Sequence, residues 1–275
     1  MTAVVNNDFA TAIDPARFAR SVGVVPDPWQ VDLLFSLERQ VILLCGRQVG
    51  KTTIVAIAAL HHALNNPGSL VLVLSPSLRQ SSELFKKIIG FYQGLGSPIP
   101  SEIQTALTLE LTNKSRIISL PGKDHTVRGY SGVSLLLIDE AARVSDDLYY
   151  AVRPMLAVSQ GRIVLLSTPC GKRGFFFREW EEGQDWLKIK ITADRCPRIP
   201  KAFLEQERRD IGERWFAQEY LCSFEESNAA LFAYDVIQRA LCDDIEELNI
   251  DLESDADDQS KVDDHDTNEL EIDLD

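Results

Sequence analysis

Four short segments of the chain are apolar at almost every position, without the alternation of a half-buried strand. Helical patterns follow two of them, over 51–64 and from 77 to about 92. Strands that are apolar throughout and alternate with helices are typical of a parallel sheet covered on both faces. The four predicted strands are 41–45, 70–74, 133–138 and 162–166. The pattern therefore predicts an α/β fold with a mostly parallel sheet between helices.

Weaker patterns complete the predicted core domain. Segments 105–111 and 115–120 flank a polar turn and predict a β-hairpin, and a further strand is expected over 186–191. Prolines interrupt residues 1–28, which we predict to be an irregular N-terminal segment. The core domain is therefore predicted to span 29–194.

The rest of the chain divides by charge. Segment 195–242 carries charged helical patterns and predicts a small helical linker subdomain. Segment 243–275 holds 16 of the 42 acidic residues and one of the 28 basic residues, Lys261. With this charge density and no aromatic residue, we predict a disordered acidic tail. Positions 1–242 keep 27 basic and 26 acidic residues, so the net charge of −14 does not exclude nucleic-acid binding by the body.

The acidic tail repeats the pattern E-L-x-I-D-L, at 247–252 and again at 269–274. In an extended strand its alternate apolar residues lie on one face. Two interpretations stay open for the tail. It is either a solubilising segment or a pair of short motifs that add to the sheet edge of a partner.

Several protein classes conflict with the composition. No stretch approaches the 18 apolar residues of a membrane helix, and the N-terminus lacks the pattern of a secretory signal. The five cysteines are odd in number and scattered, which favours reduced thiols in a cytoplasm-like compartment over a disulfide scaffold. We expect no association with a membrane and no metal site of the Cys/His type.

A phosphate-binding loop is predicted between the first strand and the first long helix. Gly46-Arg47-Gln48-Val49-Gly50-Lys51-Thr52 ends in the G-K-T core of such loops, and the eight-residue pattern fits with Cys45 in place of its first glycine. Backbone N–H groups and the start of the helix would surround phosphate oxygens. Lys51 is expected to contact the β- and γ-phosphates, and the Thr52 hydroxyl to hold Mg²⁺. The loop therefore predicts a nucleotide site with Mg²⁺, and the carboxylates that follow the third apolar run favour ATP as that nucleotide.

Two carboxylates, Asp139 and Glu140, follow the third apolar run. In a parallel sheet this position lies at the same edge as the phosphate loop. Asp139 suits Mg²⁺, directly or through water, and Glu140 is placed to act as a general base on a water molecule. A glutamate in that position favours an ATP-hydrolysing motor over a small GTPase.

The order of four motifs resembles the ATPase domain of the large terminase subunit, the motor that packages DNA into tailed-phage capsids. The motifs are W-Q at 29–30, G-R-Q-V-G-K-T-T at 46–53, L-L-L-I-D-E-A at 135–141 and L-L-S-T-P at 165–169. The resemblance covers about 25 to 240 and implies a P-loop NTPase fold of the RecA/ASCE-like type. Phosphate loops vary in this family, so the displaced glycine is compatible with it.

The resemblance implies further site residues. Gln30 would recognise adenine, and Arg47 would face the γ-phosphate as a catalytic residue. Arg128 would act on the site of a neighbouring subunit, and Ser167 and Thr168 would couple hydrolysis to movement. The predicted nucleotide contacts are then Gln30, Gly46, Arg47, Gln48, Val49, Gly50, Lys51, Thr52 and Thr53.

Each of these implied roles has a plainer alternative. Gln30 would instead cap a surface helix, and Arg47 would be held inert in a salt bridge. Arg128 would be a solvated loop residue, and Ser167 and Thr168 would only end their strand.

The leading hypothesis is an ATPase motor that translocates double-stranded DNA into a phage procapsid, as a homo-oligomeric ring with a portal protein and a small terminase subunit. Large terminases normally continue into a nuclease domain, whereas this chain turns into the acidic tail. We therefore expect no nuclease site here and consider a separate nuclease subunit as a partner. The alternatives are a helicase-like remodelling ATPase and a non-enzymatic nucleotide-binding adaptor left by a prophage.

Overall fold

A computed structural model describes residues 9–122 and 129–226 of the chain. Arg128, the helical pattern over 234–241 and the acidic tail lie outside the described residues, so what the sequence predicts for them stays a prediction.

Eight strands form one sheet, in the order β3-β4-β5-β2-β6-β7-β1-β8. From β5 to β8 all neighbours are parallel, and β4 and β3 extend the edge beyond β5 as antiparallel strands. The mostly parallel sheet and the β4–β5 hairpin are thereby confirmed. The strands are β1 Gln40–Cys45, β2 Leu70–Ser75, β3 Ser101–Gln104, β4 Thr108–Leu111, β5 Arg116–Pro121, β6 Val133–Asp139, β7 Arg162–Ser167 and β8 Leu187–Ile191.

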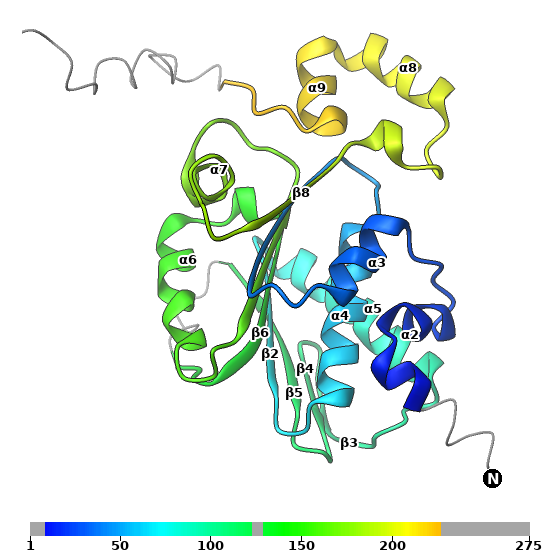
Figure 1. Cartoon of the computed structure of the whole chain (residues 1–275), viewed down its shortest axis with the longest axis vertical. Helices are drawn as coiled ribbons and strands as arrows, with labels where there is room; N and C mark the ends of the chain where they lie inside the picture. The colour runs from blue at the N-terminus through cyan, green and yellow to red at the C-terminus, as the bar shows by residue number, and fades with distance from the viewer. Residues whose placement is uncertain (1–8, 123–128, 227–275) are drawn as a thin grey trace, which may run out of the picture. The chain divides into compact units, whose positions relative to one another are not determined.

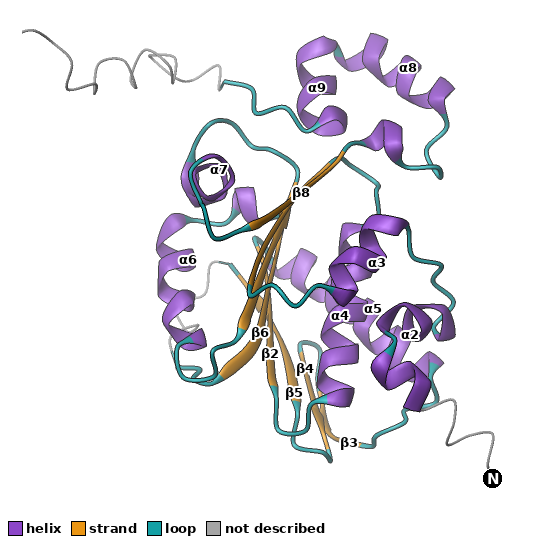
Figure 2. Cartoon of the chain, in the orientation of Figure 1, coloured by secondary structure: helices purple, strands orange, loops and turns teal. Residues whose placement is uncertain are grey.

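Helices cover both faces of this sheet (Figure 1). Helices α2 to α5 lie on one face and α6 and α7 on the other, as the purple ribbons on either side of the orange strands show (Figure 2). The α-helices are α2 Pro15–Ser21, α3 Pro28–Phe35, α4 Lys51–Asn65, α5 Leu78–Gly94, α6 Asp146–Val152, α7 Gly174–Glu181, α8 Lys201–Ile211 and α9 Glu213–Leu221. Short 3-10 helices are η2 Ala141–Arg143, η3 Arg153–Leu156 and η4 Ala193–Arg195.

Strand β1 shows why the central strands are apolar throughout. Val41, Leu43 and Cys45 pack into the core beneath α4 and α5, while Ile42 and Leu44 pack into the core beneath α6 and α7. Successive side chains of a strand point to opposite faces, so a strand between two helical layers has no solvent-facing position.

The prediction that residues 1–28 are irregular is wrong over 15–21, which form α2. Pro15 lies in the first turn of this helix, where its missing N–H costs nothing. The Asp14 carboxylate accepts a hydrogen bond of 2.8 Å from the backbone N–H of Arg17 and caps the helix. Phe18 and Ala19 then pack into the core beside α4. The local sequence around Pro15 does not distinguish a proline that starts a helix from one that breaks it.

Two helices lie in the predicted linker segment, as the sequence pattern indicates. Leu204 on α8 packs against Phe216 and Tyr220 on α9 and against Ala193 of η4. This small apolar cluster holds the two helices together beyond strand β8.

Candidate nucleotide-binding site

The site lies where three neighbouring parallel strands end. In the sheet, β7 lies between β6 and β1, and the pairing places Asp139 beside Leu166 and Leu44 beside Ser167. The turn that follows β1, the carboxylates that end β6 and the hydroxyls that end β7 therefore share one edge. Ligands of open α/β sheets bind at this edge.

The predicted phosphate loop connects β1 to the 15-residue helix α4. Two of its residues have left-handed backbone, Gln48 with φ 60° and Gly50 with φ 94°. A glycine adopts the latter conformation without strain, which explains the residue at the helix start. The loop thus turns its backbone towards the first turn of α4, whose N–H groups form a ready anion site.

Gly46 is required by a close approach of the chain after β8. A methyl group on its Cα would lie 2.8 Å from the Tyr220 carbonyl oxygen and 3.0 Å from the Ala193 nitrogen. Both contacts are with backbone, which cannot swing aside as a side chain can. The Gly46 N–H donates to the Ile191 carbonyl at 2.8 Å, so the loop is fixed at its start by β8.

Lys51 is buried at the first position of α4, with 7% of its surface exposed. Its Nζ donates to the Gly46 carbonyl oxygen at 3.1 Å, across the phosphate loop. An ammonium group carries three protons, so this contact leaves donors for an anion in the loop. The contact of Lys51 with the β- and γ-phosphates stays a prediction.

Thr52 and Asp139 are brought into contact. The Thr52 Oγ1 donates to Asp139 Oδ2 at 3.1 Å, and the other carboxylate oxygen accepts from the Glu140 N–H at 3.0 Å. Burial of Asp139, followed by the nearby charge of Glu140, raises the pKa of Asp139 to about 6. Two hard oxygen ligands at the edge of a phosphate loop suit Mg²⁺.

Glu140 follows Asp139 in a left-handed backbone conformation, with φ 51° and ψ 42°. Its Oε2 accepts a hydrogen bond of 2.8 Å from Arg143. The side chain lines the cleft in front of the phosphate loop. Glu140 thus lies at the cleft, and its role as a base stays a prediction.

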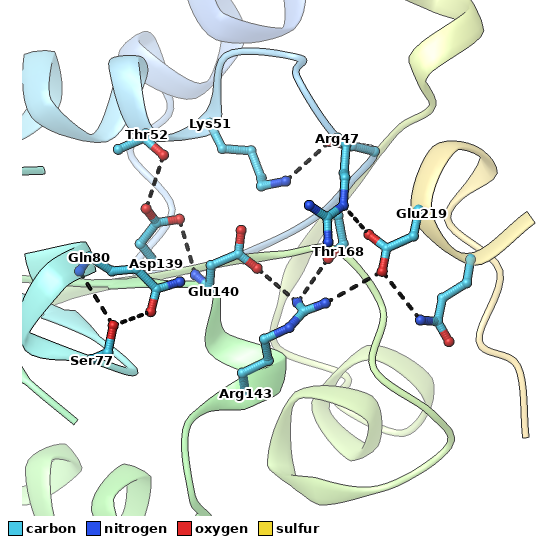
Figure 3. Close-up of polar contacts among 12 residues, drawn as sticks. Arg47, Lys51, Thr52, Ser77, Gln80, Asp139, Glu140, Arg143, Thr168 and Glu219 are labelled. Carbon is cyan, nitrogen blue, oxygen red and sulfur yellow. Dashed lines mark hydrogen bonds and ion pairs between the residues drawn. The ribbon is translucent and has the colours of Figure 1, made fainter. Parts of the chain in front are cut away.

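Arg47 forms an ion pair that sequence reasoning left open. Its Nε contacts Glu219 Oε2 of α9 at 2.5 Å, and this bond raises the pKa of Arg47 above its usual range (Figure 3). Arg143 reaches the other oxygen of Glu219 at 3.6 Å and also donates to Thr168 Oγ1 at 2.9 Å. The two arginines and two glutamates therefore form one charged network across the site.

Gln30 takes part in a helix cap. Its Oε1 accepts from the Asp27 N–H at 2.9 Å and completes a capping box at the start of α3. Its Nε2 lies 3.5 Å from the Gly50 carbonyl oxygen, so α3 rests against the phosphate loop. The alternative that Gln30 caps its helix is confirmed, and its recognition of adenine stays a prediction.

Ser167 and Thr168, which are predicted to couple hydrolysis to movement, lie at the end of β7, between the ends of β6 and β1. Ser167 and Thr168 are both buried at the end of β7. Thr168 is joined to Arg143, whereas the Ser167 hydroxyl has no hydrogen-bond partner among the described residues. Thr168 thus belongs to the charged network, and the coupling role itself stays a prediction.

These residues surround an open cleft of about 440 Å³. Four cationic side chains and one carboxylate line the cleft, so its charge suits a polyphosphate. Lys87 and Gln80 come from α5, on the side facing the phosphate loop. The lining residues are Arg47, Gln48, Gly50, Lys51, Thr52, Thr53, Gln80, Lys87, Glu140 and Arg143.

Three residues of the site were missed by sequence reasoning: Arg143, Glu219 and Arg198. Arg198 donates to Asp27 Oδ1 at 2.6 Å and to the Val49 carbonyl at 3.0 Å, and so ties the phosphate loop to α3. Arg143 had a local signal, because a helical residue three positions after Glu140 faces it. Glu219 and Arg198 had none, since their partners lie far away in the sequence.

Over 9–122 and 129–226, no group of three or more His, Cys, Asp or Glu side chains gathers in a way that would hold a metal ion. None of the helices described there has the length and apolar character needed to cross a membrane.

Comparison with known proteins gives one family. The model of the N-terminal part of the terminase large subunit, T4-like-virus type, matches residues 42–239. The terminase large subunit of Escherichia phage T5 is 27% identical over 226 residues, which make up 76% of this chain and 50% of that protein. The chain therefore spans about half the length of this curated relative.

Solved structures share the fold. The ATPase domain of the large terminase of Thermus phage P74-26 superposes with a TM-score of 0.67 at 19% identity, covering 76% of this chain and 98% of that one. The large terminase of a thermophilic bacteriophage, solved in complex with ATP-gamma-S, superposes with a TM-score of 0.56 at 14% identity. That match covers 72% of this chain and 52% of the other.

Proposed function

Because this chain belongs to the T4-like-virus type of the terminase large subunit family, we propose that it hydrolyses ATP to drive double-stranded DNA into a phage procapsid. The observation that carries the proposal is the contact between Thr52 and Asp139 beside the buried Lys51. It joins a phosphate loop to a strand-end carboxylate in one cationic cleft. The relative solved with ATP-gamma-S supports ATP as the nucleotide.

The phosphate loop supplies binding. Lys51 and the N–H groups at the start of α4 hold phosphate oxygens, with Lys51 on the β- and γ-phosphates. Arg47, at the mouth of the cleft, is proposed to contact the γ-phosphate. Such contacts stabilise negative charge that spreads over the phosphate oxygens during transfer.

Hydrolysis is proposed to depend on Asp139, Glu140 and Thr52. Thr52 and Asp139 are proposed to hold Mg²⁺, which when bound neutralises phosphate charge. Glu140 orients a water molecule and accepts its proton, which requires that its carboxylate face the cleft. Arg143 fixes the direction of that carboxylate through a bond of 2.8 Å.

The proposal that the protein moves DNA rests on the family to which it belongs. We propose double-stranded DNA, a portal protein and a small terminase subunit as partners, and a ring of subunits in the host cytoplasm as the active form. In that ring, Arg128 is proposed to reach the neighbouring site.

A single set of assays separates this function from its alternatives. Phosphate release from ATP is measured with and without double-stranded DNA, beside displacement of a third strand from a triplex and separation of a duplex. Stimulated hydrolysis with triplex displacement and no strand separation is expected. Strand separation would favour the helicase-like alternative, and nucleotide binding without any hydrolysis would favour the adaptor. Lys51→Ala serves as the inactive control.

A further inference from the structure

One wall of the cleft comes from helix α5, which carries none of the four motifs. Strand β2 pairs with β6 on the side opposite to β7 and β1, so the turn after β2 borders Asp139 and Glu140 on the side away from the phosphate loop. Helix α5 follows this turn. Gln80, in its first turn, lines the cleft together with Glu140 and with Lys87, which lies about two helical turns further along.

Ser77 fixes the direction of the Gln80 side chain. The Ser77 hydroxyl caps α5 by accepting a hydrogen bond from the Gln80 N–H at 3.4 Å, and it donates to Gln80 Oε1 at 2.7 Å. The amide oxygen is thus used by the helix cap, and the amide nitrogen faces away from Ser77, towards Glu140 (Figure 3). No side chain or carbonyl among the described residues accepts a hydrogen bond from this nitrogen.

The surroundings of the amide nitrogen suit an anionic acceptor. The one carboxylate that lines the cleft, Glu140, already accepts from Arg143 at 2.8 Å. Arg47 and Lys51 approach the cleft from the phosphate loop, whereas Gln80 approaches from α5. Phosphoryl transfer spreads negative charge over three oxygens of the terminal phosphate, so donors on two sides stabilise more of that charge than donors on one side.

We propose that Gln80 is a catalytic residue: its amide nitrogen donates a hydrogen bond to an oxygen of the γ-phosphate, and Ser77 holds the amide in that direction. This inference rests on the proposed function of the site. A diphosphate, held by the phosphate loop and the first turn of α4, does not extend to Gln80. The contact therefore adds affinity for ATP and not for ADP, and it strengthens as charge gathers on the γ-phosphate.

Binding of ATP-gamma-S and of ADP to the full chain with Mg²⁺, measured by calorimetry, tests the contact. Gln80→Ala should raise the Kd for ATP-gamma-S about three- to tenfold and leave the Kd for ADP within about twofold of the wild-type value. Turnover of ATP should fall about 10–10²-fold. Gln93→Ala is the matched control, since Gln93 is an exposed residue of the same helix and does not line the cleft.

Gln80→Glu separates the phosphate contact from a role in the helix cap alone. A glutamate keeps an oxygen for Ser77 and suits the first turn of a helix, so urea unfolding should resemble that of the wild type. It lacks the amide donor and repels phosphate, so the Kd for ATP-gamma-S should rise more than in Gln80→Ala and more than the Kd for ADP. Equal effects on both nucleotides, or an unchanged affinity for ATP-gamma-S, would overturn the contact.

Ser77 is tested as a positioning residue by a double-mutant cycle. Ser77→Ala should weaken the binding of ATP-gamma-S in the wild-type chain and should have no further effect in the Gln80→Ala chain. The same loss in both chains would show that Ser77 does not act through Gln80.

Failure of the contact and failure of the proposed function give different results. A wild-type chain that binds neither nucleotide would contradict both. A wild-type chain that does not hydrolyse ATP, but whose affinity for ATP-gamma-S falls selectively in Gln80→Glu, would contradict the proposed hydrolysis and support the contact.

Discussion

The Thr52 hydroxyl and the Asp139 carboxylate, 87 positions apart in the chain, are joined by a hydrogen bond of 3.1 Å. The contact links the first turn of α4 to the end of β6 and sets the two oxygen ligands side by side. One consequence is electrostatic. Asp139 is almost completely buried. Among the described residues, Lys51 is the one positive charge that lowers the pKa of Asp139. Ionisation of Asp139 therefore costs more free energy in the ligand-free folded chain than in water.

Replacing Asp139 with Asn should stabilise the ligand-free protein at high pH. The usual pKa of 3.8 is raised to about 6 in the folded chain, so the protonated form contributes stability below about pH 4. That contribution is lost as pH rises through 6, at a cost of roughly 3 kcal/mol. Urea unfolding without Mg²⁺ should show Asp139→Asn more stable than wild type by about 1–3 kcal/mol at pH 8. The difference should vanish near pH 4.

An exposed aspartate provides the control for this pH series. Asp185→Asn should unfold as the wild type does at both pH values, since Asp185 lies on the surface. A difference between Asp139→Asn and wild type that does not depend on pH would show that the amide changes packing. In that case the effect would not come from the buried charge.

Lys51→Ala and Glu140→Gln should fail in different ways. Loss of Lys51 removes a phosphate contact, so both nucleotide affinity and turnover should fall. Glu140→Gln keeps the hydrogen bonding of the side chain but cannot accept a proton, so affinity should remain and turnover fall about 10²–10⁴-fold. Calorimetry beside phosphate release separates the two effects, with the exposed Lys86→Ala as control. Hydrolysis near the normal rate in Glu140→Gln would remove Glu140 from the role of base.

The central sheet could be predicted because its strands are buried on both faces. The runs that became β1, β2, β6 and β7 contain few polar residues, and the motifs at their ends meet as the parallel topology requires. Strand β3 was missed because all four of its residues are exposed and carry no periodic pattern. The same explanation does not hold for α2, whose apolar residues were present but were discounted because of Pro15.

The site could be predicted only as far as local sequence defines it. Lys51, Thr52 and Asp139 sit on motifs whose spacing reflects one loop and one strand end. Glu219 lies 172 positions after its partner Arg47, and Arg198 lies 149 positions after its partner Val49. The residues around Glu219 and Arg198 carry no motif. Long-range ion pairs of this kind depend on how α8 and α9 return to the phosphate loop, which no local pattern encodes.

Gly46→Ala should destabilise the chain, although the backbone of Gly46 is not left-handed. The added methyl group would lie 2.8 Å from the Tyr220 carbonyl oxygen, and separation of the two segments should cost about 1–3 kcal/mol. Nucleotide affinity should fall as well, because the phosphate loop begins here. In Gly90→Ala the methyl group meets no atom within 4 Å, and an exposed helical site should gain up to about 1 kcal/mol. Thermal unfolding of both variants checks the contrast, and equal melting temperatures would contradict it.

Arg198→Ala should loosen the phosphate loop, although Arg198 itself does not line the cleft. Its guanidinium holds Asp27 at 2.6 Å and the Val49 carbonyl at 3.0 Å, so α3 and the loop move together. Asp27 is 9% exposed, and its Oδ2 has no hydrogen-bond partner among the described residues. Removing Arg198 leaves this carboxylate without its ion pair, at a cost of roughly 1.5–3 kcal/mol. We expect a lower free energy of unfolding and weaker binding of both ATP-gamma-S and ADP, since the loop holds the phosphates common to both. The exposed Arg195→Ala should change neither, and a loss of stability without any loss of affinity would show that the clamp does not shape the loop.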